Sequence, residues 1–476
     1  MQNNAVHEKV LEFFYDICSI PHGSGNTRAI AEWCVDFAKK RNLKVIKDKF
    51  DNVIIYKGAS AGFENSKPVI LQGHLDMVCQ SDKDFDFTNN ALDVYTDGDF
   101  IKAKGTTLGA DNGIALAMIL AILDDSTLSH PPIEAVFTSD EEIGMVGALK
   151  LDTKLLKSKR MINLDSEEEN KLTVSCAGGR DIKIEVPLIR EKVRGTLVKI
   201  SLEKLLSGHS GVEIDKGRVN ADSLLSRILN HMAKFFDFSI ISISGGTKSN
   251  AIPGEARAEI VTKNADEFIL EADKYLSIVK EEISAREPNF VFSIKEVETG
   301  DFNCIEKRLG EKIIKFLVAS PFGIINMSAQ IKGLVETSIN LGILDCTDNT
   351  LTAVYSLRSN KMSALDALEE KITALSSLLV CKVTLFGHYP SWDYKENSQL
   401  QKLYQKCYRE IFEKDIEIEA IHAGLECGVF ASQIENLDCI SIGPDLFDVH
   451  TTNEKMSISS VFRVLDVLLK VLHELK

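Results

Sequence analysis

The sequence predicts an α/β fold, in which a mixed, mostly parallel sheet with helices on both faces is interrupted by an inserted α+β domain. Short apolar runs alternate with helical patterns in the first part of the chain and again in its tail, which is typical of a parallel sheet covered on both faces. The middle of the chain instead has two similar sets of strands and helices, which suggest two ferredoxin-like units side by side. Of the 476 residues, 44% are hydrophobic, enough to build a large core.

The first part of the chain predicts three helices and several short strands. Apolar residues at helical spacing predict helices at 6–18 and 27–38, and an apolar stretch predicts a buried helix at 114–123. Shorter apolar runs bounded by polar turns predict strands at 44–47, 53–56, 69–72, 133–138 and 161–164. The tail, residues 398–476, returns to the same alternation, with a strand that begins at Cys439.

The inserted domain is predicted over residues 188–384, so the enclosing domain covers 1–187 and 385–476. Its first set of elements has strands at 197–202, 238–244, 255–262 and 290–296, with helices at 221–236 and 265–286. Its second set has helices at 305–318 and 363–380, with strands at 336–343, 351–358 and 382–387.

Charge and composition exclude several classes of partner. Asp and Glu (70) outnumber Lys and Arg (55), and the net charge of −15 argues against a nucleic acid or an anionic membrane as partner. The longest apolar run, Gly113 to Leu123, is too short to span a bilayer, and the first residues lack the pattern of a signal peptide. The ten cysteines form no Cys-x-x-Cys pair, so we expect reduced thiols in a cytoplasmic protein and a metal site, if any, built from His and carboxylates.

Imidazoles and carboxylates follow the ends of several predicted strands. In chain order these residues are His74, Asp76, Asp111, Glu141, Glu142, Asp165 and His450. Ligands of such sheets bind outside the carboxyl ends of the strands, so we expect these side chains to converge. Each motif alone has an ordinary alternative, such as a surface turn, a solvated face or a helix cap, but four in order at strand ends are hard to explain as accidents.

A cluster of carboxylates is costly unless a cation neutralises it. Two His with carboxylates and no Cys suit Zn, and also Mn or Co, and the number of acids suggests two metal ions that share one carboxylate. In the motif His74-x-Asp76, the carboxylate can bond the imidazole nitrogen that faces away from the metal. Glu141 and Glu142 diverge at a strand end, so one can bind metal while the other handles a proton of water.

Together these residues resemble the di-metal aminoacylase/carboxypeptidase superfamily, and within it the aminoacyl-histidine dipeptidases, also called Xaa-His dipeptidases or bacterial carnosinases. The resemblance runs over nearly the whole chain. It rests on the motifs at residues 72–78, 108–113, 140–144, 163–167, 176–179, 208–211, 250–253 and 421–428.

The resemblance implies a zinc-peptidase-like catalytic domain with two divalent metal ions, and it assigns the site residues. Asp111 would bridge both ions, with His74 and Asp165 completing one site and Glu142 and His450 the other. Glu141 would be the general base, and Asp76 would support His74. Similar enzymes have a cis peptide after the bridging Asp, which predicts a cis Asp111–Asn112 bond.

The resemblance also makes the inserted domain a lid that contributes substrate contacts. His209 would reach the scissile carbonyl, and Asn250 and Arg358 would bind substrate, Arg358 through its C-terminal carboxylate. Gly424, Glu426 and His422 would complete the substrate site, although the last two could equally belong to a buried hydrogen-bond network. Taken alone, His209 could be a surface histidine, Asn250 a turn residue and Arg358 an edge-strand charge.

The implied reaction is hydrolysis of a dipeptide, preferentially Xaa-His, by a metal-activated water. A tripeptidase, a broad-specificity dipeptidase and an N-acyl amino acid deacylase stay open as alternatives. A non-catalytic binding protein is disfavoured because Glu141 and all five metal ligands are present. A lid with two ferredoxin-like units could supply within one chain what smaller relatives obtain from a partner, so a monomer and a homodimer are both open.

Overall fold

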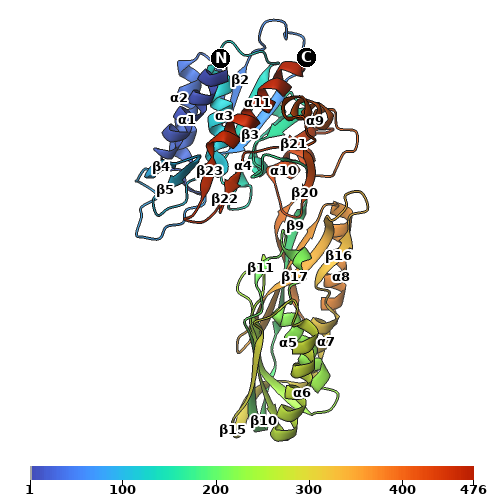
Figure 1. The fold of residues 1–476 in the computed structure, drawn as a ribbon. Helices are drawn as coiled ribbons and strands as arrows, with labels where there is room; N and C mark the ends of the chain where they lie inside the picture. Colours follow the sequence, from blue (N-terminus) through green and yellow to red (C-terminus); the bar gives the residue numbers. More distant parts are fainter. Residues whose placement is uncertain (1–2) are drawn as a thin grey trace. The chain divides into compact units, whose positions relative to one another are not determined.

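The computed structural model describes residues 3–476, which form two compact units. The first unit comprises the chain up to Cys176 together with Trp392–Ala420 and Leu425–Lys476, and the second comprises Ala177–Ser391 and Ile421–Gly424. Both chain ends belong to the first unit (Figure 1). Among the described residues, every helix is too short or too polar to cross a bilayer.

The first unit is built on an eight-stranded sheet. Four neighbouring strands at its centre run parallel, β6, β3, β7 and β21, while β1, β2 and β8 add antiparallel strands outside them. In the order of the sheet, the strands are β1 (Lys44–Lys47), β2 (Val53–Lys57), β6 (Ile133–Thr138), β3 (Val69–His74), β7 (Arg160–Asn163), β21 (Asp438–Ser441), β8 (Lys171–Cys176) and β20 (Glu417–Ile421). The predicted α/β class with a mixed, mostly parallel sheet is confirmed for this unit.

Helices cover this sheet, and one of them is apolar on all sides. Every side chain of α3 (Ala110–Asp124) from Ile114 to Leu123 is buried, as expected for a helix in the interior of an α/β unit. The other helices are α1 (Asn3–Cys18), α2 (Arg28–Lys40), α4 (Val146–Lys150), α9 (Gln399–Phe412), α10 (Glu426–Gln433) and α11 (Ile458–Glu474), with a short 3₁₀ turn at Thr153–Leu155.

The first unit also contains a small four-stranded sheet, which was not predicted. It consists of β22 (Leu446–Phe447), β23 (Lys455–Ser457), β5 (Phe100–Ala103) and β4 (Val94–Asp97). The strands are short, and β4 is largely exposed, so they lack the apolar alternation that marks a strand in sequence. Because β23 pairs with β5, this sheet joins the segment that precedes Asp111 to the segment that carries His450.

The second unit has one antiparallel sheet of nine strands. Along the sheet the order is β15 (Val291–Ile305), β10 (Arg190–Glu203), β14 (Ala256–Thr262), β12 (Phe238–Gly245), β17 (Val335–Cys346), β18 (Thr350–Ser359), β9 (Gly178–Pro187) and β19 (Lys382–Tyr389), with β16 (Gly323–Met327) paired to β17. Its helices are α5 (Ala221–Met232), α6 (Ala265–Ile283), α7 (Lys307–Ala319) and α8 (Met362–Ser376), which lie along one side of the sheet in Figure 1.

The strand order confirms two ferredoxin-like units side by side. The first runs β10-α5-β12-β14-α6-β15, and its strands lie in the order fourth, first, third, second. The second runs β9-α7-β17-β18-α8-β19 with the mirror-image order, and the two halves meet where β12 pairs with β17. The first half is inserted in the chain between β9 and α7 of the second half.

The boundaries of the second unit differ from the predicted 188–384. β9 lies outside those limits and β19 extends across one of them, yet both belong to the nine-stranded sheet, where β9 pairs with β18 on one side and with β19 on the other. The tetrapeptide Ile421–Gly424 also belongs to this unit, which no sequence pattern indicated. β15 extends nine residues beyond the predicted strand 290–296, because it is an edge strand whose exposed half carries polar residues.

Candidate metal centre and active site

The parallel strands of the first unit deliver the predicted ligands to one edge of the sheet. His74 is the last residue of β3, Glu142 follows β6, and Asp165 follows β7, so their side chains start from neighbouring carboxyl ends. His450 follows β22, in the segment after β21. The structure thus brings together residues that are hundreds of positions apart in the chain.

Asp111 lies between two imidazoles. Its Oδ1 is 3.1 Å from Nε2 of His74, and its Oδ2 is 3.1 Å from Nε2 of His450. His74 Nε2 also lies 3.4 Å from Asp165 Oδ1, and His450 Nε2 lies 2.9 Å from Glu142 Oε1. Each oxygen of one carboxylate therefore belongs to a different group of donor atoms.

These distances fit a metal site. Donor atoms bound tetrahedrally to one ion at about 2.1 Å lie roughly 3.4 Å from each other, close to the separations found here. Single ligand atoms of His74, Asp111 and Glu142 all lie within 4.8 Å of one another. The donors are imidazole nitrogens and carboxylate oxygens without a thiolate, a set that suits Zn, Mn or Co.

The charges in this cluster shift the pKa values strongly. Burial alone would lower the pKa of His74, but the carboxylates of Asp165 and Asp111 raise it well above the usual value. For Asp111, burial acts to raise the pKa, yet the hydrogen bonds from His450 and His74 hold it well below the usual range. Hydrogen bonds to Asp111 and Glu142 raise the pKa of His450 to about 11. Without a metal ion, the cluster therefore holds protons where a cation would otherwise neutralise the acids.

Asp76 joins the His74 side to the loop of the two glutamates. Its Oδ1 lies 3.5 Å from Nδ1 of His74 and accepts a hydrogen bond of 2.9 Å from the backbone N–H of Glu141. Its Oδ2 accepts hydrogen bonds from the Ser24 hydroxyl (2.8 Å) and the backbone N–H of Glu142 (3.3 Å). Asp76 is 1% exposed, and its carboxylate is held by contacts with His74, Ser24 and the backbone of the two glutamates.

Glu141 has a carboxylate that hydrogen-bonds to none of the described residues, although its backbone N–H is held by Asp76. Burial raises its pKa well above the usual value, and nearby Asp165 and Glu426 add to this effect while His74 opposes it. A carboxyl group with a raised pKa and both oxygens available can accept a proton and return it.

Asn112 links two strand ends behind Asp111. Its Oδ1 accepts from the backbone N–H of His74 (3.1 Å), and its Nδ2 donates to the carbonyl of Leu164 (2.8 Å). The Asp111–Asn112 peptide bond is cis, as expected from the resemblance. The role of this amide was not predicted, because an Asp-Asn-Gly sequence is typical of an ordinary tight turn.

Glu454 holds the loop of Asp111, and sequence analysis missed it. Its Oε2 accepts from the backbone N–H groups of Leu108 (2.7 Å) and Gly109 (3.1 Å), and its Oε1 accepts from those of Ala110 (2.9 Å) and Asp111 (3.4 Å). The side chain is 3% exposed. Since Glu454 lies four residues after His450, one carboxylate ties together the two loops that carry these ligands. Its only signal in sequence is that spacing.

Glu426 ends a buried polar ladder beneath the strand ends. Gln72, Asn163 and Ser441 are direct neighbours on β3, β7 and β21, and their side chains hydrogen-bond to one another in that order. Glu426 accepts from Gln72 and from the Thr138 hydroxyl (2.6 Å) through Oε2. It is fully buried, and burial raises its pKa to about 7. These contacts favour the alternative in which Glu426 belongs to a buried hydrogen-bond network, and its role as a substrate contact stays a prediction.

In the second unit, His209 and Arg358 lie side by side. Nη2 of Arg358 is 3.5 Å from Nε2 of His209, and Nη1 donates to the Tyr389 hydroxyl (2.8 Å). Nδ1 of His209 accepts from the backbone N–H groups of Gly211 and Val212, both at 3.2 Å, so this neutral ring carries its proton on Nε2. Burial, and then the charge of Arg358, lower the pKa of His209 to about 4. Two donors therefore face each other without an acceptor between them.

The remaining predicted residues of the second unit have different surroundings. Asn250 lines the same cavity as Arg358. His422 is 5% exposed and lies 2.7 Å from the Ser338 hydroxyl, and burial followed by Arg358 lowers its pKa to about 3. These contacts favour the network alternative for His422. Gly424 lies in the short segment that returns to this unit.

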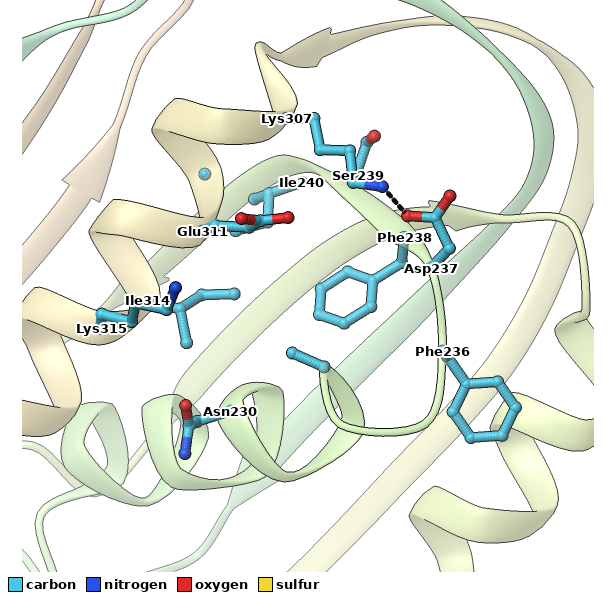
Figure 2. Close-up of a pocket in the computed structure, with 12 residues that line it drawn as sticks. Asn230, Phe236, Asp237, Phe238, Ser239, Ile240, Lys307, Glu311, Ile314 and Lys315 are labelled. Atoms are coloured by element: carbon cyan, nitrogen blue, oxygen red, sulfur yellow. Dashed lines mark hydrogen bonds and ion pairs between the residues drawn. The ribbon is translucent and has the colours of Figure 1, made fainter.

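Another cavity of the second unit, of about 210 Å³, lies between α5, β12 and α7 (Figure 2). Its floor includes Phe238 and Ile240, and an ion pair between Lys307 and Asp237 closes one side. Its lining contains no histidine or cysteine among the described residues.

Comparisons with known proteins agree with this arrangement. Residues 70–474 match the model of Peptidase family M20/M25/M40. The chain is 39% identical over 470 residues to the cytosol non-specific dipeptidase of Escherichia coli, which covers 98% of this chain and 97% of that protein. The crystal structure of aminoacylhistidine dipeptidase from Vibrio alginolyticus superposes with a TM-score of 0.90 at 35% identity, covering 98% of this chain and 96% of the other.

A more distant structure shows how widely the fold is shared. Aminopeptidase PepT from Bacillus cereus has a TM-score of 0.59 at 13% identity, with 98% of each chain covered, which shows the fold alone. The family match spans both segments that carry the imidazoles on either side of Asp111, and the E. coli relative matches over almost the full length. The chain therefore belongs to Peptidase family M20/M25/M40.

Proposed function

We propose that this chain is a metallo-dipeptidase that hydrolyses dipeptides at the cluster around Asp111. The observation that carries the proposal is the position of this carboxylate, which presents one oxygen to His74 and the other to His450. A carboxylate shared between two imidazole-carboxylate groups is the arrangement of a two-metal hydrolase. The names of the E. coli and V. alginolyticus relatives, both dipeptidases, support the same reaction.

Two divalent ions, zinc first and Mn or Co as alternatives, would be held by the five ligands. His74 and Asp165 would bind one ion, His450 and Glu142 the other, and Asp111 both. When bound, such ions supply electrophilic activation of the scissile carbonyl and make a water molecule more acidic.

The proton transfers are assigned to Glu141. Its free carboxylate accepts the proton of the attacking water and gives it to the leaving amine. Asp76 serves as a positioning residue, since it fixes both the ring of His74 and the backbone of Glu141. The two adjacent glutamates therefore have different roles: Glu141, whose carboxylate is free, transfers protons, and Glu142, which lies beside His450, binds metal.

Substrate binding is assigned to the second unit. Nε2–H of His209 and the guanidinium of Arg358 are donors that share no acceptor, so each is available for an anionic oxygen of the substrate. We assign the developing oxyanion to His209 and the C-terminal carboxylate to Arg358, with Asn250 as a further contact in the same cavity. The oxyanion needs a donor of this kind, and His209 is kept neutral by burial.

A preference for Xaa-His dipeptides is part of the proposal, with a broad-specificity dipeptidase, a tripeptidase and an N-acyl amino acid deacylase as alternatives. The printed names of the relatives support both a non-specific and an aminoacyl-histidine activity. We further propose that the binding partner is a small peptide and that the protein is cytoplasmic. A monomer and a homodimer are both compatible with the proposal. A panel of β-Ala-His, Gly-His, other dipeptides, tripeptides and acyl amino acids separates the alternatives.

The experiment that tests the mechanism is Glu141→Gln. The amide cannot accept a proton, so we expect kcat on Gly-His to fall by about 10²–10⁴-fold while bound metal, measured by elemental analysis, stays unchanged. Glu168→Gln, which alters an exposed glutamate paired with Lys171, is the matched control and should keep full activity. Near-normal turnover in the Glu141 variant would remove this residue from the mechanism.

A further inference from the structure

The cavity that contains Arg358 has a second charged end. It has a volume of about 450 Å³ and belongs entirely to the second unit. Besides Asn250 and Arg358, its lining includes Asp181, Lys248, Ser356 and Tyr389. The cavity therefore has charged groups that could bind a second part of a ligand besides its carboxylate.

Strand register places the acid and the guanidinium on the same face of the sheet. Asp181 is paired with Ser356, and Gly179 is paired with Arg358, on the neighbouring strands β9 and β18. Because side chains two residues apart on a strand point the same way, Asp181 and Arg358 project from the same face, at diagonal positions. They form no ion pair with each other, so each charge is left for a ligand.

Arg358 itself indicates that a ligand belongs here. It is 7% exposed, its Nε is buried without a hydrogen-bond partner, and none of the described residues pairs an acid with it. The Tyr389 hydroxyl fixes one arm of the guanidinium, and this contact depends on Gly179, where a Cβ atom would lie 2.3 Å from the tyrosine ring. A buried, oriented and unpaired guanidinium fits an incoming carboxylate.

Asp181 lies on the other side of the same space. Its carboxylate forms no hydrogen bond or ion pair with the described residues. Beside it is Gly387, which lines the same cavity, has a φ of +61° and whose Cβ position would be 3.9 Å from Asp181 Cγ, so no side chain at position 387 covers the acid. Lys248 also lines the cavity but is exposed, and its long side chain can remain in solvent.

We propose that Asp181 determines specificity by binding a cationic or N–H-donating side chain of the substrate's C-terminal residue, while Arg358 binds the α-carboxylate of that residue. This inference rests on the proposed dipeptidase function and names the substrate class within it: dipeptides that end in His, Lys or Arg. An imidazole N–H donates to Asp181 when neutral and gains a charge-assisted bond when protonated.

The test compares two substrates that differ by one charge. Gly-Lys and Gly-norleucine have the same unbranched carbon side chain, with and without a terminal ammonium group. We expect the wild-type enzyme to prefer Gly-Lys, and Asp181→Asn to lower kcat/KM for Gly-Lys by about tenfold while leaving Gly-norleucine unchanged. Asp181→Lys should reverse the preference towards Gly-Glu. Asp366→Asn, which removes an exposed acid paired with Arg180 outside the cavity, is the matched control.

A loss of equal size on both substrates, or no change on either, would overturn the assignment of Asp181. Binding of free L-lysine and L-norleucine, measured by calorimetry on the same variants, gives a readout that needs no catalysis. If no dipeptide is cleaved but Asp181→Asn weakens the binding of lysine and not that of norleucine, the proposed function fails, while Asp181 remains the binding group for a cationic side chain. If dipeptides are cleaved without any effect of this charge, the inference fails and the proposed function stands.

Discussion

Replacement of Glu454 by glutamine tests whether the two ligand loops are held together by this one carboxylate. The carboxylate accepts four backbone N–H groups, two on each oxygen. Glutamine keeps one acceptor oxygen and turns an NH₂ donor towards the other two N–H groups. Hydrogen bonds to a charged group contribute about 1.5–3 kcal/mol each, and one of the four is long, so we expect a loss of about 3–5 kcal/mol in the free energy of unfolding of the first unit.

The same substitution should weaken metal binding, because Asp111 belongs to the loop that is released. Loss of a partner that orients a ligand typically costs ten- to a hundredfold in metal affinity, and we expect an effect of this size. Titration of the apo-protein with Zn in the presence of a competing chelator measures it. Both tryptophans, Trp33 and Trp392, belong to the first unit, so their fluorescence follows the unfolding of that unit alone in urea.

Asp448→Asn is the control for Glu454→Gln. It makes the same acid-to-amide change in the same loop, at an exposed side chain, and Asn tolerates the positive φ of 54° at that position. We expect wild-type metal affinity and stability for this variant. If Glu454→Gln also matched the wild type in both measurements, the four hydrogen bonds would not be what holds the loop of Asp111.

Two further predictions concern the second unit. The pKa values of His209 and His422 are about 4 and about 3 in the folded protein, below the usual 6.5, so the unfolded chain takes up more protons and stability should fall as the pH drops from 6.5 towards 4. Hydrogen-exchange protection of this unit at pH 4.5 and pH 7 measures the effect, and equal protection at both would contradict it. Gly179→Ala should displace the ring of Tyr389 and break its bond to Arg358, raising KM for dipeptides about tenfold with little change in kcat. Steady-state kinetics decide this, with Tyr389→Phe as a milder variant in the same direction, and an unchanged KM in the alanine variant would refute the role of Gly179.

The sequence predicts those parts of the fold in which apolar periodicity is strong. The buried strands β3, β6 and β7 and the apolar helix α3 follow the predicted ranges closely, because burial on both faces leaves continuous apolar runs. The small sheet that includes β4 could not be predicted, since its strands are short and mostly exposed. Edge strand β15 was predicted too short for the same reason.

The residues of the candidate site likewise divide into those that the sequence predicts and those that it does not. His74 ends the apolar strand β3, and Glu142 follows the apolar strand β6 within a short loop, where a polar side chain is conspicuous in sequence. Glu454 accepts hydrogen bonds from backbone N–H groups, and Tyr389 accepts one from Arg358 on another strand. Such partners depend on how the chain folds, so residue spacing in the sequence does not indicate them. The buried polar ladder that includes Gln72 could not be predicted either, because its members lie on different strands and become neighbours only through strand pairing.

The nested order of the second unit has a consequence for biosynthesis. The strands of the inner half, from β10 to β15, are contiguous in the chain, whereas β9 must wait for β18 and β19, which are translated after the whole inner half. The inner half can therefore acquire structure while the ribosome is still elongating, and the outer half closes around it later. Gly179, which makes room for the tyrosine ring beside Arg358, lies on the late-pairing strand, so this strand is fixed next to β18 and β19 only near the end of synthesis.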